Sequence, residues 1–216
     1  MKKSVLLIGM GKFGRTLGER LLEMGDEVLI VDKNEDKINA LAPKYTDALI
    51  INCMDEGSLR TLDIPAFDAC VVAIGDDFQS SLEITSLLKD LGAKWVVSKA
   101  TTEIQRKFLL RNGANEVIFP DLDLAEKLAI KLNSARVYDY IEVNEEYSIF
   151  ELAVPKTWVG KKLVELNPRK KYGLNLLTVK KNATVVENLD ANYLFEDGDH
   201  MLVFGKTGQI LKFANK

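Results

Sequence analysis

A glycine-rich loop near the N-terminus constrains the fold of this chain more than any other stretch. An apolar run, residues 5–8 (VLLI), leads directly into Gly9-Met10-Gly11-Lys12-Phe13-Gly14, which has the spacing G-x-G-x-x-G. A helical pattern of leucines follows, and then a second apolar run, residues 28–31 (VLIV), which Asp32 closes. This order of strand, glycine loop, helix, strand and acid predicts a dinucleotide-binding βαβ unit.

Each part of this unit has a physical role in holding a nucleotide. Gly9 permits a tight turn after the strand, Gly11 presents no Cβ to an approaching phosphate, and Gly14 allows close packing of helix and strand. The helix N-terminus offers unpaired N–H groups and a partial positive charge to the phosphates. Asp32 follows at close to the expected spacing of ~20 residues, where its carboxylate can accept hydrogen bonds from ribose hydroxyls. A Rossmann scaffold that has lost its ligand is the alternative that this pattern leaves open.

The alternation of short apolar runs and helical segments continues to residue 132. Strand-like runs cover residues 48–51, 68–74, 95–97 and 116–119. Strands that alternate with helices in this way predict an α/β fold with a Rossmann-like, doubly wound parallel sheet. Ligands of such sheets bind beyond the carboxyl ends of the strands. This rule selects the loops that follow the predicted strands: residues 9–14, 32–33, 52–55, 75–76, Lys99 and Asp121.

The character of the sequence changes after residue 135. Residues 136–143 and 147–154 are rich in Val, Ile and aromatic residues, and further strand-like runs follow, separated by turn signals and a short helix. This pattern predicts a small α+β C-terminal domain. We therefore expect two domains, residues 1–134 and residues 135–216, joined by a helix because the link is not rich in Gly or Ser.

Composition limits the classes of function. The net charge of −3 argues against a broad nucleic-acid-binding surface. The longest apolar runs are strand-length, far short of the ~20 residues of a membrane helix, and no signal-peptide pattern follows Met1. Cys53 and Cys70 form no C-x-x-C motif, which indicates a reducing compartment and hence a cytoplasmic location.

Several motifs taken together resemble one known family. They are residues 8–14 (IGMGKFG), Val31-Asp32, residues 71–75 (VVAIG), residues 112–120 and residues 198–205 (GDHMLVFG), the last being similar to a family motif G-D-x-L-x-V-x-G. Over essentially its whole length the chain is similar to the cytoplasmic regulatory subunits of bacterial Trk/Ktr potassium-uptake systems. These carry an RCK (regulator of K⁺ conductance) N-domain and a smaller RCK C-domain.

This resemblance implies a regulatory protein and not an enzyme. The N-domain would bind ATP, ADP or NAD(H), and dimers would assemble into a homo-oligomeric, usually octameric ring on the cytoplasmic face of a potassium-translocating membrane subunit. Nucleotide exchange would change the shape of the ring and gate the pore. The C-domain would serve regulation and dimerisation. In some members it binds cyclic di-AMP, and the basic residues 167–173 (NPRKKYG) resemble that region, with a solvated turn as the alternative.

The resemblance also suggests roles for individual residues. Lys12 lies in the phosphate loop, where the family often has a basic residue that can meet a terminal phosphate. Lys99 matches a family lysine near the ligand, and Asp32 disfavours NADP by repelling a 2′-phosphate. Asp121 is the candidate ligand of a divalent cation, with a helix N-cap as its alternative. The candidate nucleotide-binding residues are Gly9, Met10, Gly11, Lys12, Phe13, Gly14, Asp32, Lys33, Asn52, Cys53, Ala73, Ile74, Gly75 and Lys99.

Two other functions stay open. An NAD-dependent oxidoreductase is compatible with the Rossmann-like half, although no Tyr is followed four residues later by the Lys of a short-chain dehydrogenase. The single histidine, His200, lies far along the chain beside a predicted strand, where a structural role fits better than that of a general base. The second of these functions is that of a nucleotide sensor that acts on a soluble partner.

Overall fold

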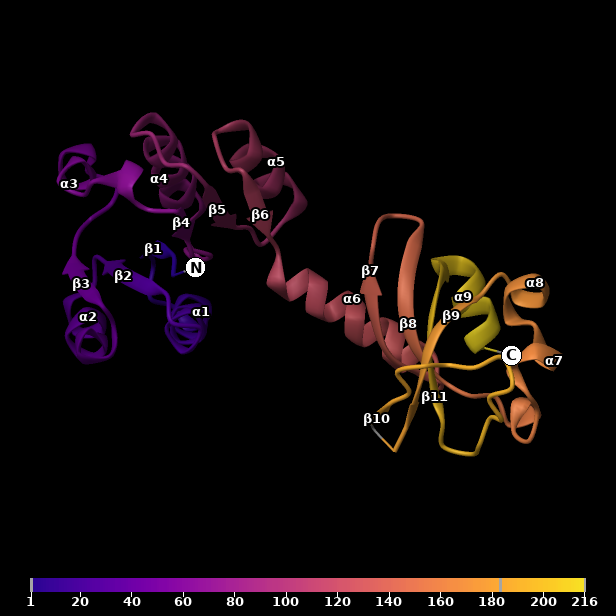
Figure 1. Cartoon of the computed structure of the whole chain (residues 1–216). Coiled ribbons are helices and arrows are strands. Elements are labelled where there is room, and N and C mark those ends of the chain that lie inside the picture. Colours follow the sequence, from indigo (N-terminus) through magenta and orange to yellow (C-terminus); the bar gives the residue numbers. More distant parts are fainter. Residues whose placement is uncertain (1, 183, 216) are drawn as a thin grey trace. The chain divides into compact units, whose positions relative to one another are not determined.

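A computed structural model describes residues 2–182 and 184–215 of the chain, which divides into two compact units between Leu122 and Asp123 (Figure 1). The first unit contains a parallel sheet of six strands in the order β3-β2-β1-β4-β5-β6. The predicted Rossmann-like, doubly wound sheet is therefore confirmed. Its strands are β1 (Ser4–Ile8), β2 (Glu27–Asp32), β3 (Asp47–Ile50), β4 (Ala69–Val72), β5 (Val96–Lys99) and β6 (Glu116–Ile118).

Strand β1 lies between β2 and β4 and is buried on both of its faces. Val5 and Leu7 belong to one cluster of buried apolar side chains, whereas Leu6 and Ile8 belong to another. Because successive side chains of a strand point to opposite faces, these two clusters are the two sides of one sheet. The uninterrupted apolar run of the sequence follows from this double burial.

Helices connect the strands of the first unit, as crossovers between parallel strands require. Four of these helices begin with a side-chain cap: Asn34 on α2, Asp55 on α3, Asp77 on α4 and Thr102 on α5 each accept a hydrogen bond from a backbone N–H. The helices are α1 (Lys12–Glu23), α2 (Glu35–Leu41), η1 (Ala42–Lys44), α3 (Glu56–Arg60), η2 (Ile64–Ala66), α4 (Phe78–Asp90) and α5 (Glu103–Arg111).

The second unit has an antiparallel sheet of five strands in the order β10-β9-β11-β8-β7. Alternate residues of β8 face the core, where Phe150 and Leu152 are fully buried beside Trp158 and Phe195. The predicted small α+β domain is confirmed. Its elements are β7 (Val137–Glu142), β8 (Tyr147–Ala153), η3 (Lys156–Trp158), α7 (Leu163–Leu166), α8 (Pro168–Tyr172), β9 (Asn175–Lys181), β10 (Thr184–Val185), β11 (His200–Lys206) and α9 (Thr207–Ala214).

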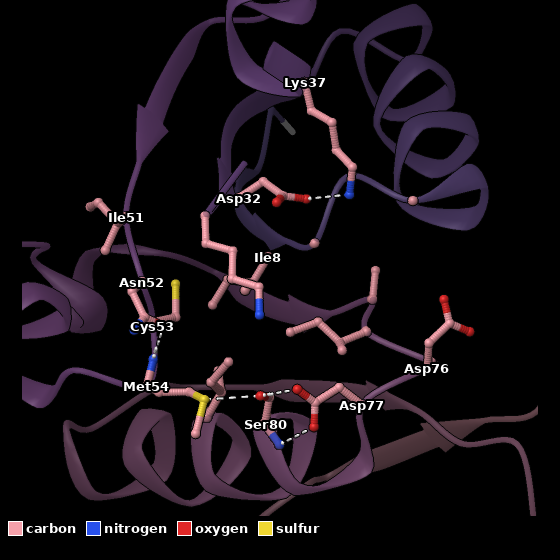
Figure 2. A pocket seen from close by; sticks show the side chains of 17 residues that line it. Ile8, Asp32, Lys37, Ile51, Asn52, Cys53, Met54, Asp76, Asp77 and Ser80 are labelled. Atoms are coloured by element: carbon pink, nitrogen blue, oxygen red, sulfur yellow. Dashed lines mark hydrogen bonds and ion pairs between the residues drawn. The ribbon is translucent and has the colours of Figure 1, made fainter. Parts of the chain in front are cut away.

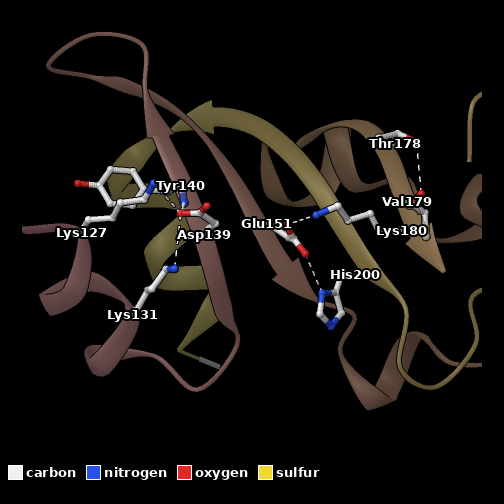
Figure 3. A network of polar contacts seen from close by, with 9 residues as sticks. All are labelled: Lys127, Lys131, Asp139, Tyr140, Glu151, Thr178, Val179, Lys180 and His200. Carbon is white, nitrogen blue, oxygen red and sulfur yellow. Dashed lines mark hydrogen bonds and ion pairs between the residues drawn. The ribbon is translucent and has the colours of Figure 1, made fainter. Parts of the chain in front are cut away.

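Helix α6 (Pro120–Asn133) carries the chain from the first unit to the second. Its C-terminal part belongs to the second unit: the Nζ atoms of Lys127 and Lys131 lie 3.0 and 3.7 Å from Oδ1 of Asp139 on β7 (Figure 3), and Ile130 packs against the core. The compact units therefore divide near the start of α6, whereas the sequence pattern placed the boundary at its end, between residues 134 and 135. None of the helices in residues 2–182 and 184–215 has both the length and the hydropathy to span a bilayer.

Candidate nucleotide-binding site

A pocket of about 250 Å³ opens at the carboxyl edge of the parallel sheet (Figure 2). It lies at the ends of β1, β2, β3 and β4, where the order of the strands reverses between β1 and β4. Ligands of open α/β sheets bind at such a switch point. The lining residues are Ile8, Gly9, Gly11, Asp32, Lys33, Lys37, Ile51, Asn52, Cys53, Met54, Ala73, Ile74, Gly75, Asp76, Asp77, Ser80 and Ile84.

The three glycines of the loop have different surroundings. Gly9 has a φ of +96°, a conformation that favours glycine. A Cβ on Gly14 would lie 2.1 Å from the carbonyl oxygen of Gly9, so α1 approaches the end of β1 as closely as backbones allow. A Cβ on Gly11 would meet no atom within 4 Å, and Gly11 lines the pocket. No side chain therefore covers the backbone of Gly11 on the side that faces the pocket.

Helix α1 begins without a side-chain cap. Gly11 is its N-cap residue and offers no acceptor to the first N–H groups, in contrast to the capped helices α2 to α5. The first N–H groups of a helix have no partner within the helix and attract anions. The N-terminus of α1, which begins within the glycine loop, can therefore bind a phosphate through its unpaired N–H groups.

Asp32 is a buried carboxylate at the end of β2, with a side chain only 9% exposed. Its Oδ2 accepts hydrogen bonds from the N–H of Met10 at 2.8 Å and from Nζ of Lys37 at 3.3 Å, and its Oδ1 accepts one from the N–H of Asn34 at 2.9 Å. Burial by itself would raise the pKa of Asp32. The two backbone hydrogen bonds and the Lys37 charge outweigh that effect, so its pKa is lowered and the group is ionised at neutral pH.

The opposite wall of the pocket is formed by α4 and the loop after β3. Asp77 accepts hydrogen bonds from the N–H and the hydroxyl of Ser80, and Asn52 accepts one from the N–H of Met54. Burial, with the nearby charge of Asp32, raises the pKa of the Cys53 thiol to about 12. Cys53 therefore stays protonated at neutral pH and lines the pocket as an apolar side chain.

Most of the residues predicted from the sequence come together at this pocket. Those that line it are Gly9, Gly11, Asp32, Lys33, Asn52, Cys53, Ala73, Ile74 and Gly75. Met10 is fully buried in the core and reaches the site only through its N–H, which donates to Asp32. Gly14 does not line the pocket and instead packs against the carbonyl oxygen of Gly9.

Three further predicted residues lie outside the lining of the pocket. Nζ of Lys99 is 5.9 Å from the centre of the Phe13 ring and would be 3.2 Å from a Cβ on Gly75, which places Lys99 next to the lining. Lys12 is exposed in the first turn of α1. The Lys99 cation is therefore close to a ligand that extends beyond the pocket, whereas Lys12 is placed near the pocket only by following the lining residue Gly11 in the chain.

The predicted metal ligand, Asp121, is exposed in the first turn of α6. No three His, Cys, Asp or Glu residues of the described part of the chain gather as a metal site would require. The divalent cation at Asp121 therefore stays a prediction from the resemblance.

Sequence reasoning missed several lining residues, among them Lys37, Asp77 and Ser80. Asp77 and Ser80 carry a signal that could have been used, since an Asp three residues before a Ser at the start of an apolar helix is a capping pattern. Lys37 carries none, because its position depends on how a long side chain of α2 folds back toward β2.

The fold and the pocket define a two-domain protein with a Rossmann-like first domain that has a ligand pocket at its switch point and a small α+β second domain. Residues 5–120 match the TrkA-N domain and residues 148–216 match the TrkA-C domain. The chain belongs to this family, the Trk/Ktr family with RCK-type N- and C-domains, and the resemblance seen in its motifs is confirmed.

Relatives of full length support this assignment. The Ktr system potassium uptake protein C of Bacillus subtilis (strain 168) is 34% identical over 216 residues, which are 100% of this chain and 98% of that protein. The Ktr system potassium uptake protein A of the same organism is 35% identical over 214 residues, 99% of this chain and 96% of that protein. The solved structure of the GsuK channel bound to NAD shares the fold, with a TM-score of 0.68 and 16% identity over 100% of this chain and 40% of the channel chain.

We expect alanine at Gly14 and alanine at Gly11 to affect stability differently. The Cβ of Gly14→Ala would meet backbone at 2.1 Å, so the free energy of unfolding should fall by about 1–3 kcal/mol or more. The Cβ of Gly11→Ala enters open space, so only a poorer N-cap remains, worth up to about 1 kcal/mol. Urea unfolding followed by circular dichroism measures both variants, and equal losses would contradict the close packing at Gly14.

Stability should also depend on pH through Asp32. Because its pKa is lowered in the folded protein, the carboxylate contributes stability that is fully present above the unfolded pKa of ~3.9 and is lost as the pH falls through the folded value. Asp32→Asn should be less stable than the wild type by about 1–3 kcal/mol at neutral pH. This difference should shrink as the pH falls below about 4.

Urea titrations over this pH range provide the measurement. Asp63→Asn is the matched control, because Asp63 is exposed and, although it is the N-cap residue of η2, its side chain makes no cap hydrogen bond. A difference between wild type and Asp32→Asn that stays constant from neutral pH into the acid range would show that the stabilisation does not come from the charged carboxylate.

Proposed function

We propose that this protein is a cytoplasmic, nucleotide-binding regulatory subunit of a potassium uptake transporter. Binding of ATP, ADP or NAD(H) in the first domain changes the shape of a homo-oligomeric ring, and the ring gates the pore of a membrane subunit. The observation that carries the proposal is the pocket at the switch point, which joins the bare backbone of Gly11, the uncapped N-terminus of α1 and the ionised Asp32.

The parts of the pocket match the parts of a nucleotide. Phosphates suit Gly11 and the N-terminus of α1, since both offer backbone N–H groups without a competing side chain. Ribose hydroxyls suit the carboxylate of Asp32. The apolar side chains of Ile51, Met54 and Ile84 line the remaining wall and can pack against a base. Lys99 and Lys12 supply cations for a terminal phosphate beyond the pocket.

The relatives supply the physiological setting. Two proteins that match this chain from end to end are named as potassium uptake proteins of Ktr systems. The channel whose structure shares this fold was solved with NAD bound. A nucleotide can gate such an assembly only by the difference between its affinities for two shapes of the ring. A pocket that lies between several loops of one sheet edge suits that role, because loops change position at less energetic cost than the core does.

The pocket supports binding rather than catalysis. Among the described residues that line it there is no His or Tyr, and the thiol of Cys53 stays protonated. His200 lies in the other unit, where its Nδ1 is 2.9 Å from Oε1 of Glu151. Consumption of NADH with a small carbonyl substrate would favour the oxidoreductase instead. Co-purification with a soluble partner and not with a membrane transporter would favour the soluble sensor.

A stripe of leucines on α6 supports self-association. Leu124, Leu128 and Leu132 are 68%, 52% and 79% exposed and follow one another at intervals of one helical turn, so they share a face. An apolar stripe of this kind is usually covered by another protein surface. We assign it to a second copy of the chain, as the first contact in assembly of the dimer and the ring.

A second regulatory ligand is proposed for the C-terminal domain. Arg169 of α8, the helix formed by the basic stretch 168–172, lines a pocket of about 420 Å³ together with Asn167 and Asn175. A guanidinium beside two amides suits a phosphorylated ligand such as cyclic di-AMP. The remaining lining residues are Leu163, Val164, Pro168, Leu174 and Leu176.

Calorimetry with ATP, ADP, NADH and NADPH tests nucleotide binding. The wild-type protein should bind one or more of the first three in the micromolar range, and NADPH more weakly because of Asp32. Gly11→Ala and Asp32→Ala should each weaken binding by at least about tenfold. Gly208→Ala is the control, since a Cβ there also enters open space but lies in the second unit. Absence of binding to every nucleotide would refute the proposal.

Analytical ultracentrifugation tests the leucine stripe. Leu128→Glu places a charge in the middle of the proposed contact and should shift the protein toward monomers at concentrations where the wild type is oligomeric. Met24→Glu is the matched control, because Met24 is 78% exposed at the C-terminal end of α1 and belongs to no such stripe. If the two variants sediment alike, the contact does not lie on α6.

A further inference from the structure

The carboxylate of Asp32 is nearly saturated with hydrogen bonds. A carboxylate has about four lone-pair sites, two on each oxygen. Both sites of Oδ2 are taken, one by the N–H of Met10 and the other by the ammonium of Lys37. One site of Oδ1 is taken by the N–H of Asn34. A ribose whose two neighbouring hydroxyls donate to the two oxygens therefore finds room on Oδ1 but none on Oδ2.

The three donors differ in how easily they can leave. The N–H groups of Met10 and Asn34 are fixed by the glycine loop and by the turn into α2, whose cap Asn34 itself provides. Lys37 reaches Asp32 with a flexible side chain that is 46% exposed, and its Nζ–Oδ2 distance of 3.3 Å is the longest of the three. Figure 2 shows the Lys37 side chain extending from α2 to Asp32 at the pocket. Of these donors, only Lys37 can move away without disturbing the backbone.

We propose that Lys37 is an intramolecular competitor of the ribose: its ammonium occupies the hydroxyl position on Oδ2 of Asp32 in the free protein and leaves it when a nucleoside binds. This inference rests on the proposed nucleotide-binding function and adds a residue that sets affinity at that site. The ion pair must be broken before the ribose binds in full, so Lys37 weakens binding although it carries a positive charge.

Lys33 provides an internal comparison. It also lines the pocket and also carries a positive charge, but it makes no ion pair within the part of the chain that the structure describes. Its charge acts instead on Asp77, whose pKa is lowered first by hydrogen bonds from Ser80 and then by Lys33. Removing either lysine changes the net charge of the pocket equally, whereas only removal of Lys37 frees Oδ2 of Asp32.

Adenosine is the probe, because it has the ribose hydroxyls but no phosphate whose attraction to lysine would obscure the result. Binding of adenosine and of 2′,3′-dideoxyadenosine is measured by calorimetry for wild type, Lys37→Met and Lys33→Met. Lys37→Met should bind adenosine about two- to fivefold more tightly than the wild type, which is the range of a partly exposed ion pair. Lys33→Met should not bind adenosine more tightly than the wild type, because it leaves the ion pair between Lys37 and Asp32 in place. Dideoxyadenosine should gain nothing from Lys37→Met, since it has no hydroxyl to place on Oδ2.

The outcomes separate this inference from the proposed function. If the wild type binds adenosine or ADP and Lys37→Met binds adenosine equally or more weakly, Lys37 is a spectator or a ligand-binding group, and the competitor is refuted while the function stands. An equal gain for dideoxyadenosine would also refute it, because the ribose hydroxyls would then play no part. If adenosine, ADP, ATP and NADH bind to none of the three proteins, the proposed function is wrong, and the proposed role of Lys37 is refuted as well.

Discussion

The close approach of α1 to the end of β1 is the constraint on which the rest of the site depends. At Gly14 the helix comes so near to the carbonyl of Gly9 that no side chain fits between them. This contact fixes the path of the intervening residues, so that Gly11 becomes the N-cap of α1 and lines the pocket. It also turns the N–H of Met10 toward Asp32 while the Met10 side chain enters the core. One steric condition thus determines where the proposed phosphate and ribose positions lie relative to each other.

Asp32 connects this loop to the second strand and to α2. Its two backbone hydrogen bonds come from the β1–α1 loop and from the residue that caps α2, so the carboxylate ties the glycine loop, 22 residues earlier in the chain, to the turn between β2 and α2. A buried charge is stable only when it is hydrogen-bonded and paired, and this pairing also lowers the pKa of Asp32. The same group therefore stabilises the fold around the pocket and is the acceptor to which a ribose would bind. In the proposed function, binding and stability are coupled through one carboxylate, a suitable property for a site that responds to its ligand.

The sequence predicted the parts of the structure that depend on local pattern. The parallel strands appear as apolar runs because they are buried on both faces, and the positions of Gly9, Gly11 and Asp32 follow from the spacing of one motif. The sequence did not predict the positions of side chains. Lys37 is one of several lysines near the glycine loop, and only the structure shows that its side chain extends to Asp32. The division of the units near Leu122 was likewise hidden, because α6 is a continuous helix whose attachment depends on ion pairs to Asp139.

A regulatory site must release its ligand as readily as it binds it, and this requirement explains why an acceptor would be partly occupied by the protein itself. A fully free Asp32 would hold any ribose tightly, so exchange of one nucleotide for another would be slow, since affinity differences appear mainly in dissociation rates. When the ribose leaves, a lysine that returns to Asp32 takes its place, so the buried carboxylate is never left unpaired. Because all adenine nucleotides share the same ribose, such a competitor lowers every affinity by a similar factor. Discrimination among them is then left to the proposed phosphate position, which we assign to Gly11, Lys12 and Lys99.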